Sequence, residues 1–135
     1  MEFDPNEENQ MAGLVVYYCN ELFYYLYMGY DYSIGAYISV MSNNLGDLEL
    51  FAAGRVAVKA DRVYLKAEVN YSELQFYYST DDVSWIRVGD VLDMSLLSDD
   101  VSGGFTGAFV GMACHDPATM KVYADFDYFE YVEKV

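Results

Sequence analysis

Hydrophobic and polar residues alternate along much of the chain, and the clearest case is residues 63–70. Apolar side chains stand at the odd positions of this segment, from Val63 to Val69, and polar or amphipathic ones at the even positions. A period of two puts neighbouring side chains on opposite faces of a strand, so the pattern predicts a strand with one face in a core. Leu74, Phe76 and Tyr78 repeat the pattern after polar residues at 70–72, and the two runs together predict a hairpin.

Similar runs, separated by Gly, Asn, Asp and Ser, predict further strands along the chain. These are residues 11–19, 22–28, 36–41, 48–51, 85–88, 105–114 and 122–131. A count of about nine or ten strands with short turns, and no long helical period, predicts an all-β antiparallel sandwich or barrel and argues against a βαβ fold. Residues 1–135 are expected to form a single domain, in which only the ends, 1–8 and 133–135, are dispensable.

Charge limits the classes of partner. The 135 residues contain 22 acidic and 7 basic side chains, and the formal net charge is −15. Nucleic acids and anionic membranes attract clustered Lys and Arg, so we expect neither as a partner. The chain also has no apolar run of about 18 residues, and its first residues lack the features of a signal peptide, so we expect a soluble cytoplasmic protein in which Cys19 and Cys114 are buried free thiols.

Aromatic residues are abundant, with 15 Tyr and 8 Phe. Such residues favour strands, but they also form sugar-stacking surfaces and protein interfaces. Composition alone does not separate these uses.

Asp125 and Asp127 are the most conspicuous pair of acids. Two residues apart on a predicted strand, they would share one face. Three interpretations stay open: a solvent-facing strand or structural hydrogen bonds, a structural calcium site, and catalysis on a glycosidic bond.

Other motifs give little support for chemistry. His115 is the only histidine and stands in a predicted turn, so it has no second imidazole for a zinc site. The glycines of residues 103–111 do not have the spacing of a dinucleotide or phosphate loop. Residues 79–84 predict a turn fixed by Asp side chains, before Trp85, which could be a core residue or a sugar platform.

Three blocks of sequence resemble one known family. Residues 104–112, GFTGAFVGM, and 124–131, ADFDYFEY, resemble the end of glycoside hydrolase family 43 β-xylosidases, and residues 9–18, NQMAGLVVYY, resemble the first strand of the same C-terminal domain. The 77–79 hairpin and residues 96–100 fall between them in the same order, so the resemblance covers nearly the whole chain.

The resemblance implies a concanavalin-like jelly roll of two antiparallel sheets. It also implies a partner, because in this family the catalytic carboxylates belong to a β-propeller domain that precedes the sandwich. The chain is therefore expected to be an accessory domain without catalysis of its own, and its parent a hydrolase acting on xylo-oligosaccharides or arabinosides. The family's Phe in the Gly-Phe-Thr-Gly segment reaches toward the propeller's substrate pocket, and Phe105 matches it; a core position for Phe105 is the alternative.

An autonomous carbohydrate-binding module is the competing hypothesis, and a small enzyme a third. A broad patch of exposed aromatics would favour docking, whereas a groove lined by Trp and Tyr would favour sugar binding. A docking patch left uncovered would also allow the chain to form a homo-oligomer.

Overall fold

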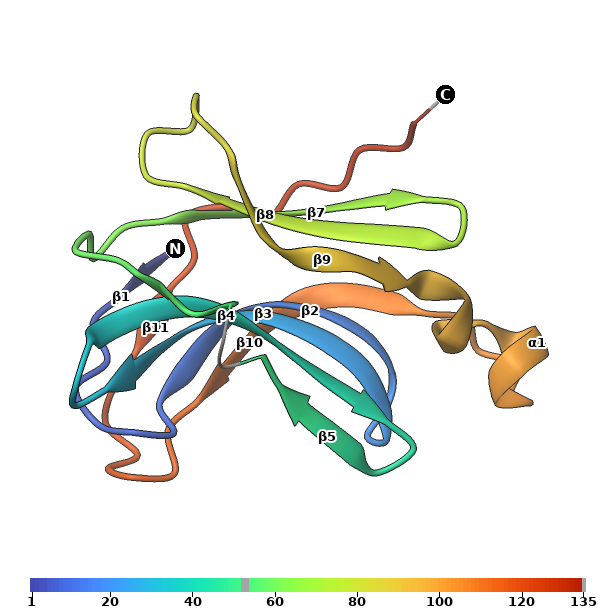
Figure 1. Ribbon diagram of the computed structural model, residues 1–135, viewed down its shortest axis with the longest axis horizontal. Coiled ribbons are helices and arrows are strands. Elements are labelled where there is room, and N and C mark those ends of the chain that lie inside the picture. Colours follow the sequence, from blue (N-terminus) through green and yellow to red (C-terminus); the bar gives the residue numbers. More distant parts are fainter. Residues whose placement is uncertain (52–53, 135) are drawn as a thin grey trace.

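Two antiparallel sheets packed face to face make up most of the computed structural model, which describes residues 1–51 and 54–134 (Figure 1). The larger sheet has the order β10 (Phe109–His115), β2 (Met11–Cys19), β3 (Leu22–Asp31), β4 (Gly35–Asn44) and β5 (Asp47–Leu50), and the short β6 (Val56–Ala57) also pairs with β4. The smaller sheet has the order β7 (Tyr64–Asn70), β8 (Glu73–Ser79) and β9 (Ile86–Asp93). A separate ribbon pairs β1 (Glu2–Phe3) with β11 (Ala124–Asp125).

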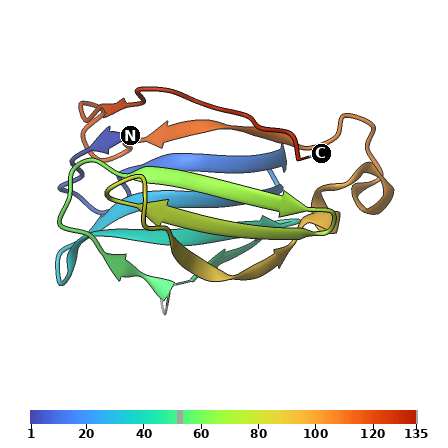
Figure 2. The same cartoon turned by 90° about the horizontal axis from the view of Figure 1, so that it is seen from above.

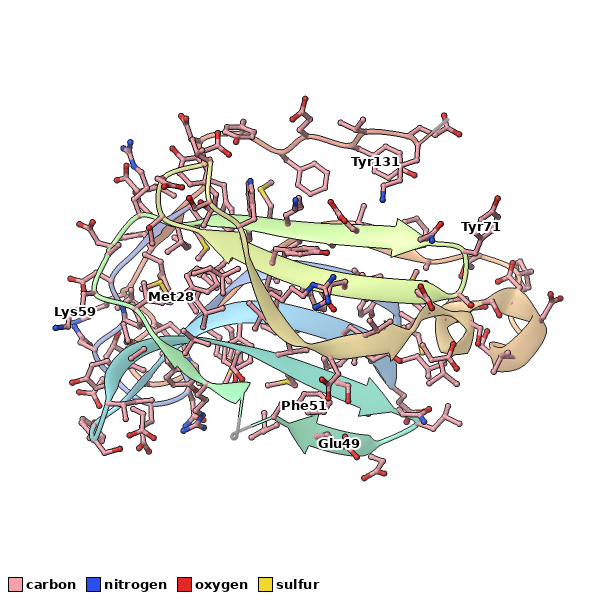
Figure 3. The ribbon with its side chains drawn as sticks, turned by 45° about the horizontal axis from the view of Figure 1, so that its top comes forward. Met28, Glu49, Phe51, Lys59, Tyr71 and Tyr131 are labelled. Atoms are coloured by element: carbon pink, nitrogen blue, oxygen red, sulfur yellow. The ribbon has the colours of Figure 1, made fainter. Side chains whose placement is uncertain are left out.

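The core lies between the two sheets. Even-numbered residues of β3, such as Leu26 and Met28, face β8, which contributes Leu74 and Phe76. All four are almost completely buried, and Met28 lies between the layers (Figure 3). The alternation seen in the sequence therefore places one face of each central strand in a shared core.

The predicted antiparallel sandwich is confirmed, and β2 and the β7–β8 hairpin match their predicted ranges closely. Two predicted strands are wrong in part. Residues 105–108 form a loop, because Gly103 and Gly107 adopt φ of 77° and 70°, which does not continue a strand. Of residues 122–131 only Ala124–Asp125 pair, and residues 126–134 run without a strand assignment along the side where β10 and β7 are edge strands (Figure 2).

The N-terminal end is part of the core, so the prediction that residues 1–8 are dispensable is wrong. Phe3 is 2% exposed and packs in the main cluster, and Pro5 is buried. The backbone N–H of Phe3 donates to the carbonyl of Asp61 at 3.0 Å. At the other end, Val135 lies outside the described residues.

Short helical segments connect β9 to β10. The 3₁₀ helix η2 (Met94–Leu97) is followed by α1 (Asp99–Ser102), and Leu97 is buried. No helix among the described residues combines the length and apolar character needed to cross a membrane. Both cysteines are free, as predicted, but the expected burial is wrong, since Cys114 is exposed and Cys19 only half-buried.

Candidate docking surface

Apart from Asp31, which ends β3 and is paired with Arg55, the outer face of the larger sheet, the face turned away from the smaller sheet, is uncharged over its three central strands. In β2, β3 and β4 the side chains on this face belong to Met11, Gly13, Val15, Tyr17, Phe23, Tyr25, Tyr27, Gly29, Tyr37, Ser39, Met41 and Asn43. The flanking strands add Leu48 and Leu50 from β5 and Phe109 from β10, all exposed. A chain with 22 acidic residues therefore has none at these positions.

Large rings cover the middle of this face. Tyr27 is 1% exposed, and its ring centroid lies 5.4 Å from that of Tyr25 and 6.0 Å from that of Tyr37. Such tilted and edge-on pairs add to the stabilisation from burial. Desolvation by burial raises the pKa of both Tyr25 and Tyr27 above the ordinary value for tyrosine.

The charges nearest to this face are paired. Arg55 Nη1 lies 2.8 Å from Asp31 Oδ2, and the guanidinium of Arg55 stands 4.5 Å from the centroid of the Tyr37 ring. Figure 1 shows the larger sheet bending away from the smaller sheet at both ends. The outer face, which carries the aromatic cluster, is therefore the concave face of the larger sheet.

The outer face of the smaller sheet has the opposite character. Its positions include Lys66, Glu68, Gln75 and Arg87, and Lys66 Nζ lies 3.1 Å from Glu68 Oε1. This is the polar exterior expected of an antiparallel sheet that faces water. The outer face of the larger sheet has no such row of charged side chains. We call this face, made up of the β2, β3, β4, β5 and β10 residues named above, the candidate docking surface.

Phe105 lies outside the core, on the loop between α1 and β10. Its side chain is 92% exposed. The loop is held by Asp99, whose Oδ1 accepts hydrogen bonds from the Gly107 N–H at 3.0 Å and from the Tyr18 hydroxyl at 2.8 Å. These two bonds lower the pKa of Asp99, so the carboxylate stays charged and the loop stays anchored. An exposed apolar side chain on a held loop fits the role that the family resemblance implies for Phe105, and that role stays a prediction.

Asp125 and Asp127 are both exposed, and only Asp125 belongs to a strand. The expectation that one strand carries both is therefore wrong. Arg62 pairs with Glu2 through Nε at 2.9 Å, and this hydrogen bond is the main cause that raises the pKa of Arg62; the negative charge of Asp127 makes a smaller contribution in the same direction. No group of three or more His, Cys, Asp or Glu that could hold a metal occurs among the described residues. Calcium at Asp125 and Asp127 stays a prediction, and the positive charge of Arg62 near Asp127 acts against it.

Two other aspartates, Asp81 and Asp116, stabilise turns by accepting hydrogen bonds. Asp81 Oδ1 accepts from the backbone N–H groups of Ser84 and Val83 at 2.7 and 2.9 Å, which confirms the predicted Asp-fixed turn. Asp116, which sequence reasoning left as part of a turn, accepts from Gln10 Nε2, from Thr119 Oγ1 and from four backbone N–H groups between 118 and 122. Desolvation acts to raise the pKa of Asp116, but these hydrogen bonds outweigh it and hold the pKa well below its usual range. The Asp-Pro pair at 116–117 was the only sequence feature that could have pointed to Asp116 as the residue that holds this turn.

Trp85 is half-buried just before β9, and the ammonium of Lys66 stands 4.5 Å from its ring centroid. One cation therefore already covers the ring. His115 is exposed at the end of β10, next to Asp116.

Comparison with known protein families matches residues 1–132 to one family, described as the β-xylosidase C-terminal concanavalin A-like domain of glycoside hydrolase family 43. The match takes in every strand described above. The sandwich reached from the pairing pattern and the family description agree.

Similar proteins are several times longer than this chain. The sequence is 36% identical over 139 residues to a xylan 1,3-β-xylosidase of a Vibrio species, covering 98% of this chain and 25% of that protein. It is 34% identical over 141 residues to xylosidase/arabinosidase 43B of Humicola insolens, covering 97% and 26%. The structure of a xylan β-1,4-xylosidase from Bacillus halodurans C-125 superposes with a TM-score of 0.82 at 30% identity, covering 90% of this chain and 24% of that one. The chain thus spans about a quarter of the length of these relatives.

Proposed function

Because the chain belongs to the family of β-xylosidase C-terminal concanavalin A-like domains, we propose that it is an accessory domain that packs on the catalytic domain of a longer glycoside hydrolase. The parent would act on xylo-oligosaccharides or arabinosides, as the names of the relatives suggest. In this role the domain stabilises its partner and contributes Phe105 to the wall of the substrate pocket.

The outer face of the larger sheet, whose one charged strand residue, Asp31, is paired with Arg55, is the observation that supports docking. A sheet face exposed to water normally carries polar residues at alternate positions, as the smaller sheet does here. Interface cores are depleted in charge and enriched in aromatic residues, and this face has both properties. We therefore assign this face to the contact with the catalytic domain.

Phe105 would act by shape and not by proton transfer. A phenyl group at the mouth of a pocket narrows it around a terminal sugar and excludes water, while the acid and base belong to the partner. The hydrogen bond from the Gly107 N–H to Asp99 holds the backbone of the loop that carries Phe105, which would reduce the cost of ordering this loop when substrate binds.

The experiment places a negative charge on each outer face in turn. Leu48 in β5 and Val91 in β9 are 52% and 53% exposed and belong to opposite sheets, so Leu48→Glu and Val91→Glu are matched variants. Association between this chain and the preceding portion of its parent, expressed separately, is measured by calorimetry. Leu48→Glu should weaken the association about tenfold or more, since an unpaired buried charge costs several kcal/mol.

Val91→Glu serves as the control and should leave the association unchanged. Circular dichroism must first show that both variants unfold at the temperature of the unmodified chain. Equal association of the two variants would remove the outer face as the contact surface.

Hydrolysis is assigned to the partner. The purified 135-residue chain should release no aryl alcohol from aryl β-xylosides or arabinosides above the buffer rate, whereas the full parent should. Turnover by the chain alone that disappears on Asp125→Asn or Asp127→Asn would overturn this assignment.

A further inference from the structure

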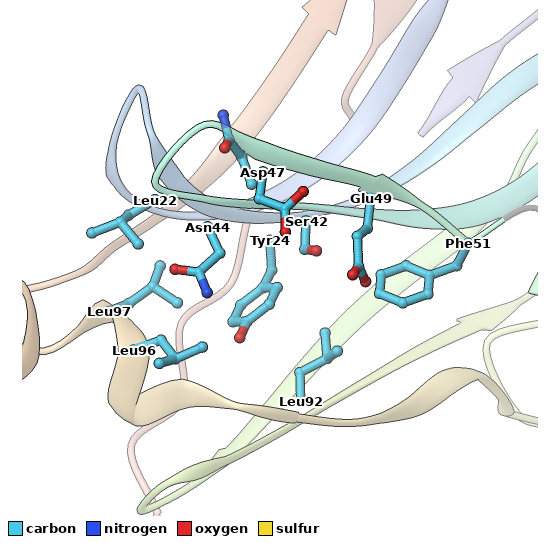
Figure 4. A pocket seen from close by; sticks show the side chains of 11 residues that line it. Leu22, Tyr24, Ser42, Asn44, Asp47, Glu49, Phe51, Leu92, Leu96 and Leu97 are labelled. Atoms are coloured by element: carbon cyan, nitrogen blue, oxygen red, sulfur yellow. The ribbon is translucent and has the colours of Figure 1, made fainter.

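A cavity of about 190 Å3 opens between the β4–β5 hairpin and η2 (Figure 4). Its lining residues are Leu22, Tyr24, Ser42, Asn43, Asn44, Asp47, Glu49, Phe51, Leu92, Leu96 and Leu97. It lies on the inner side of the larger sheet, so it is separate from the docking surface on the outer side.

The cavity lies at the edge of the sandwich, where only the end of β9 and η2 face β5. The larger sheet extends to β5, but the smaller sheet ends at β9, so the inner face of β5 looks past the edge of the core. Its two inner positions, Asp47 and Glu49, pair with Asn44 and Ser42 of β4. Inner positions of a sandwich normally carry apolar side chains, so two carboxylates here depart from the pattern.

Ser42 is the most telling residue of the lining. It is 8% exposed, its side chain faces the cavity, and its hydroxyl has no hydrogen-bond partner within the described part of the chain (Figure 4). Among the described residues the only fully enclosed side-chain atom without a partner is Arg55 Nε, so the Ser42 hydroxyl is open to the cavity and a small molecule can reach it. The side chains of Asn44, Asp47 and Glu49 are likewise unpaired among the described residues, whereas Asn43 is held by Gly46 and Asn20.

The opposite wall of the cavity is apolar. Leu92, Leu96 and Leu97 line it, and the Phe51 ring lies beside Glu49 (Figure 4). An apolar wall facing a few free polar groups is the usual composition of a small-molecule site. The volume is below the roughly 300–1,000 Å3 of sites that take drug-sized ligands, so the ligand is smaller.

We propose that this cavity binds a single neutral sugar ring. Carboxylates only accept hydrogen bonds, so Asp47 and Glu49 match the hydroxyl donors of a sugar, and their charge disfavours phosphorylated or acidic sugars. Asn44 and Ser42 both donate and accept, and the leucines and Phe51 cover the less polar face of the ring. The site is independent of the docking proposal, because every group in it belongs to this chain.

The test is a titration of the isolated ¹⁵N-labelled chain with D-xylose, followed by NMR. The expected result is saturable shifts of the amide signals of residues 42–49. Asp47→Asn should weaken binding about tenfold, the change that follows from about 1.4 kcal/mol, and Ser42→Ala should also weaken it. Asp90→Asn removes the same charge from a residue of β9 that does not line the cavity and should bind as the unmodified chain does.

Three results would overturn the proposal: no saturable shift at these amides, shifts that Asp47→Asn and Ser42→Ala leave unchanged, and saturation by calcium chloride but not by xylose, which would identify a cation site. Amide spectra of the variants without ligand establish that each is folded. A failure here leaves docking on the outer face untouched, because the titration contains no partner domain.

Discussion

At the scale of single residues, aspartates hold the irregular parts of this sandwich. Asp81, Asp99 and Asp116 each accept several hydrogen bonds from turns or loops, and in all three the folded state lowers the pKa. A lowered pKa means that the folded state stabilises the charged carboxylate more than the unfolded state does. Part of the strongly acidic composition is therefore structural.

Asp81 gives a prediction about pH. Backbone N–H groups of Ser84 and Val83, together with the Ser79 hydroxyl, lower its pKa from 3.8 to about 2. The stabilisation is fully present above the unfolded pKa and is lost as the pH falls from about 4 to about 2. In Asp81→Asn the melting temperature should therefore be lower at neutral pH and should fall less steeply over this window than in the unmodified chain.

Asp82→Asn is the control for Asp81. Asp82 has φ of 61°, which Asn tolerates, and its side chain makes no hydrogen bond among the described residues. Thermal melts of both variants between pH 2 and pH 7 decide the matter. Parallel curves for the two variants would assign the acid sensitivity to other groups.

Phe105 should separate stability from activity. Truncation of a buried Phe costs about 3–5 kcal/mol, and an exposed one far less. Since Phe105 is almost fully exposed, Phe105→Ala should leave urea unfolding of the isolated chain nearly unchanged, whereas Phe76→Ala, in the core, should lower its stability strongly. In the parent enzyme Phe105→Ala should lower kcat/KM about tenfold on short substrates, equivalent to about 1.4 kcal/mol. Normal kinetics in a folded parent would show that Phe105 has no part in the pocket.

At the scale of elements, the N-terminal strand carries more stability than its length suggests. Phe3→Ala should cost about 3–5 kcal/mol in urea unfolding, because β1 inserts this ring into the main core. Tyr123→Ala, at an exposed aromatic position in the segment before β11, is the control and should cost little. A loss below about 1 kcal/mol for Phe3→Ala would mean that the ring is replaced in the core by its neighbours.

The elements that sequence predicts well are those whose signals are local. Strand β2 and the β7–β8 hairpin have both alternation and turn residues within a few positions, and they match closely. Strand β1 pairs with β11 across almost the whole chain, and two residues carry no period, so no local signal marks β1; the predicted strand at 122–131 contains β11 but is too long. The apolar outer face was not predicted from the sequence, although residues 11–18 and 22–29 are apolar or aromatic at nearly every position, a pattern typical of strands covered on both faces. The position of the cavity depends on which strand ends the smaller sheet, and the local alternation of residues does not predict this.

At the scale of the whole molecule, charge and surface act against each other. A net charge of −15 makes copies of the chain repel, whereas the uncharged outer face favours their association once it is not covered. Salt screens repulsion between exposed charges but leaves apolar contact largely unaffected. We therefore expect the isolated chain to self-associate through the outer face, and more strongly as salt is added.

Sedimentation velocity over a range of protein and salt concentrations checks this expectation. Leu48→Glu should shift the chain toward monomer, because a second copy would then bury an unpaired carboxylate, whereas Val91→Glu on the smaller sheet should behave as the unmodified chain does. If the catalytic domain covers the outer face, as proposed, the parent should not gain association through this surface when salt is added. A chain that stays monomeric at every protein and salt concentration would contradict this expectation. The tyrosines of β3 and β4 would then shield the outer face from water without a partner. In that case the docking surface would have to be sought around Phe105 and the free edge of β10.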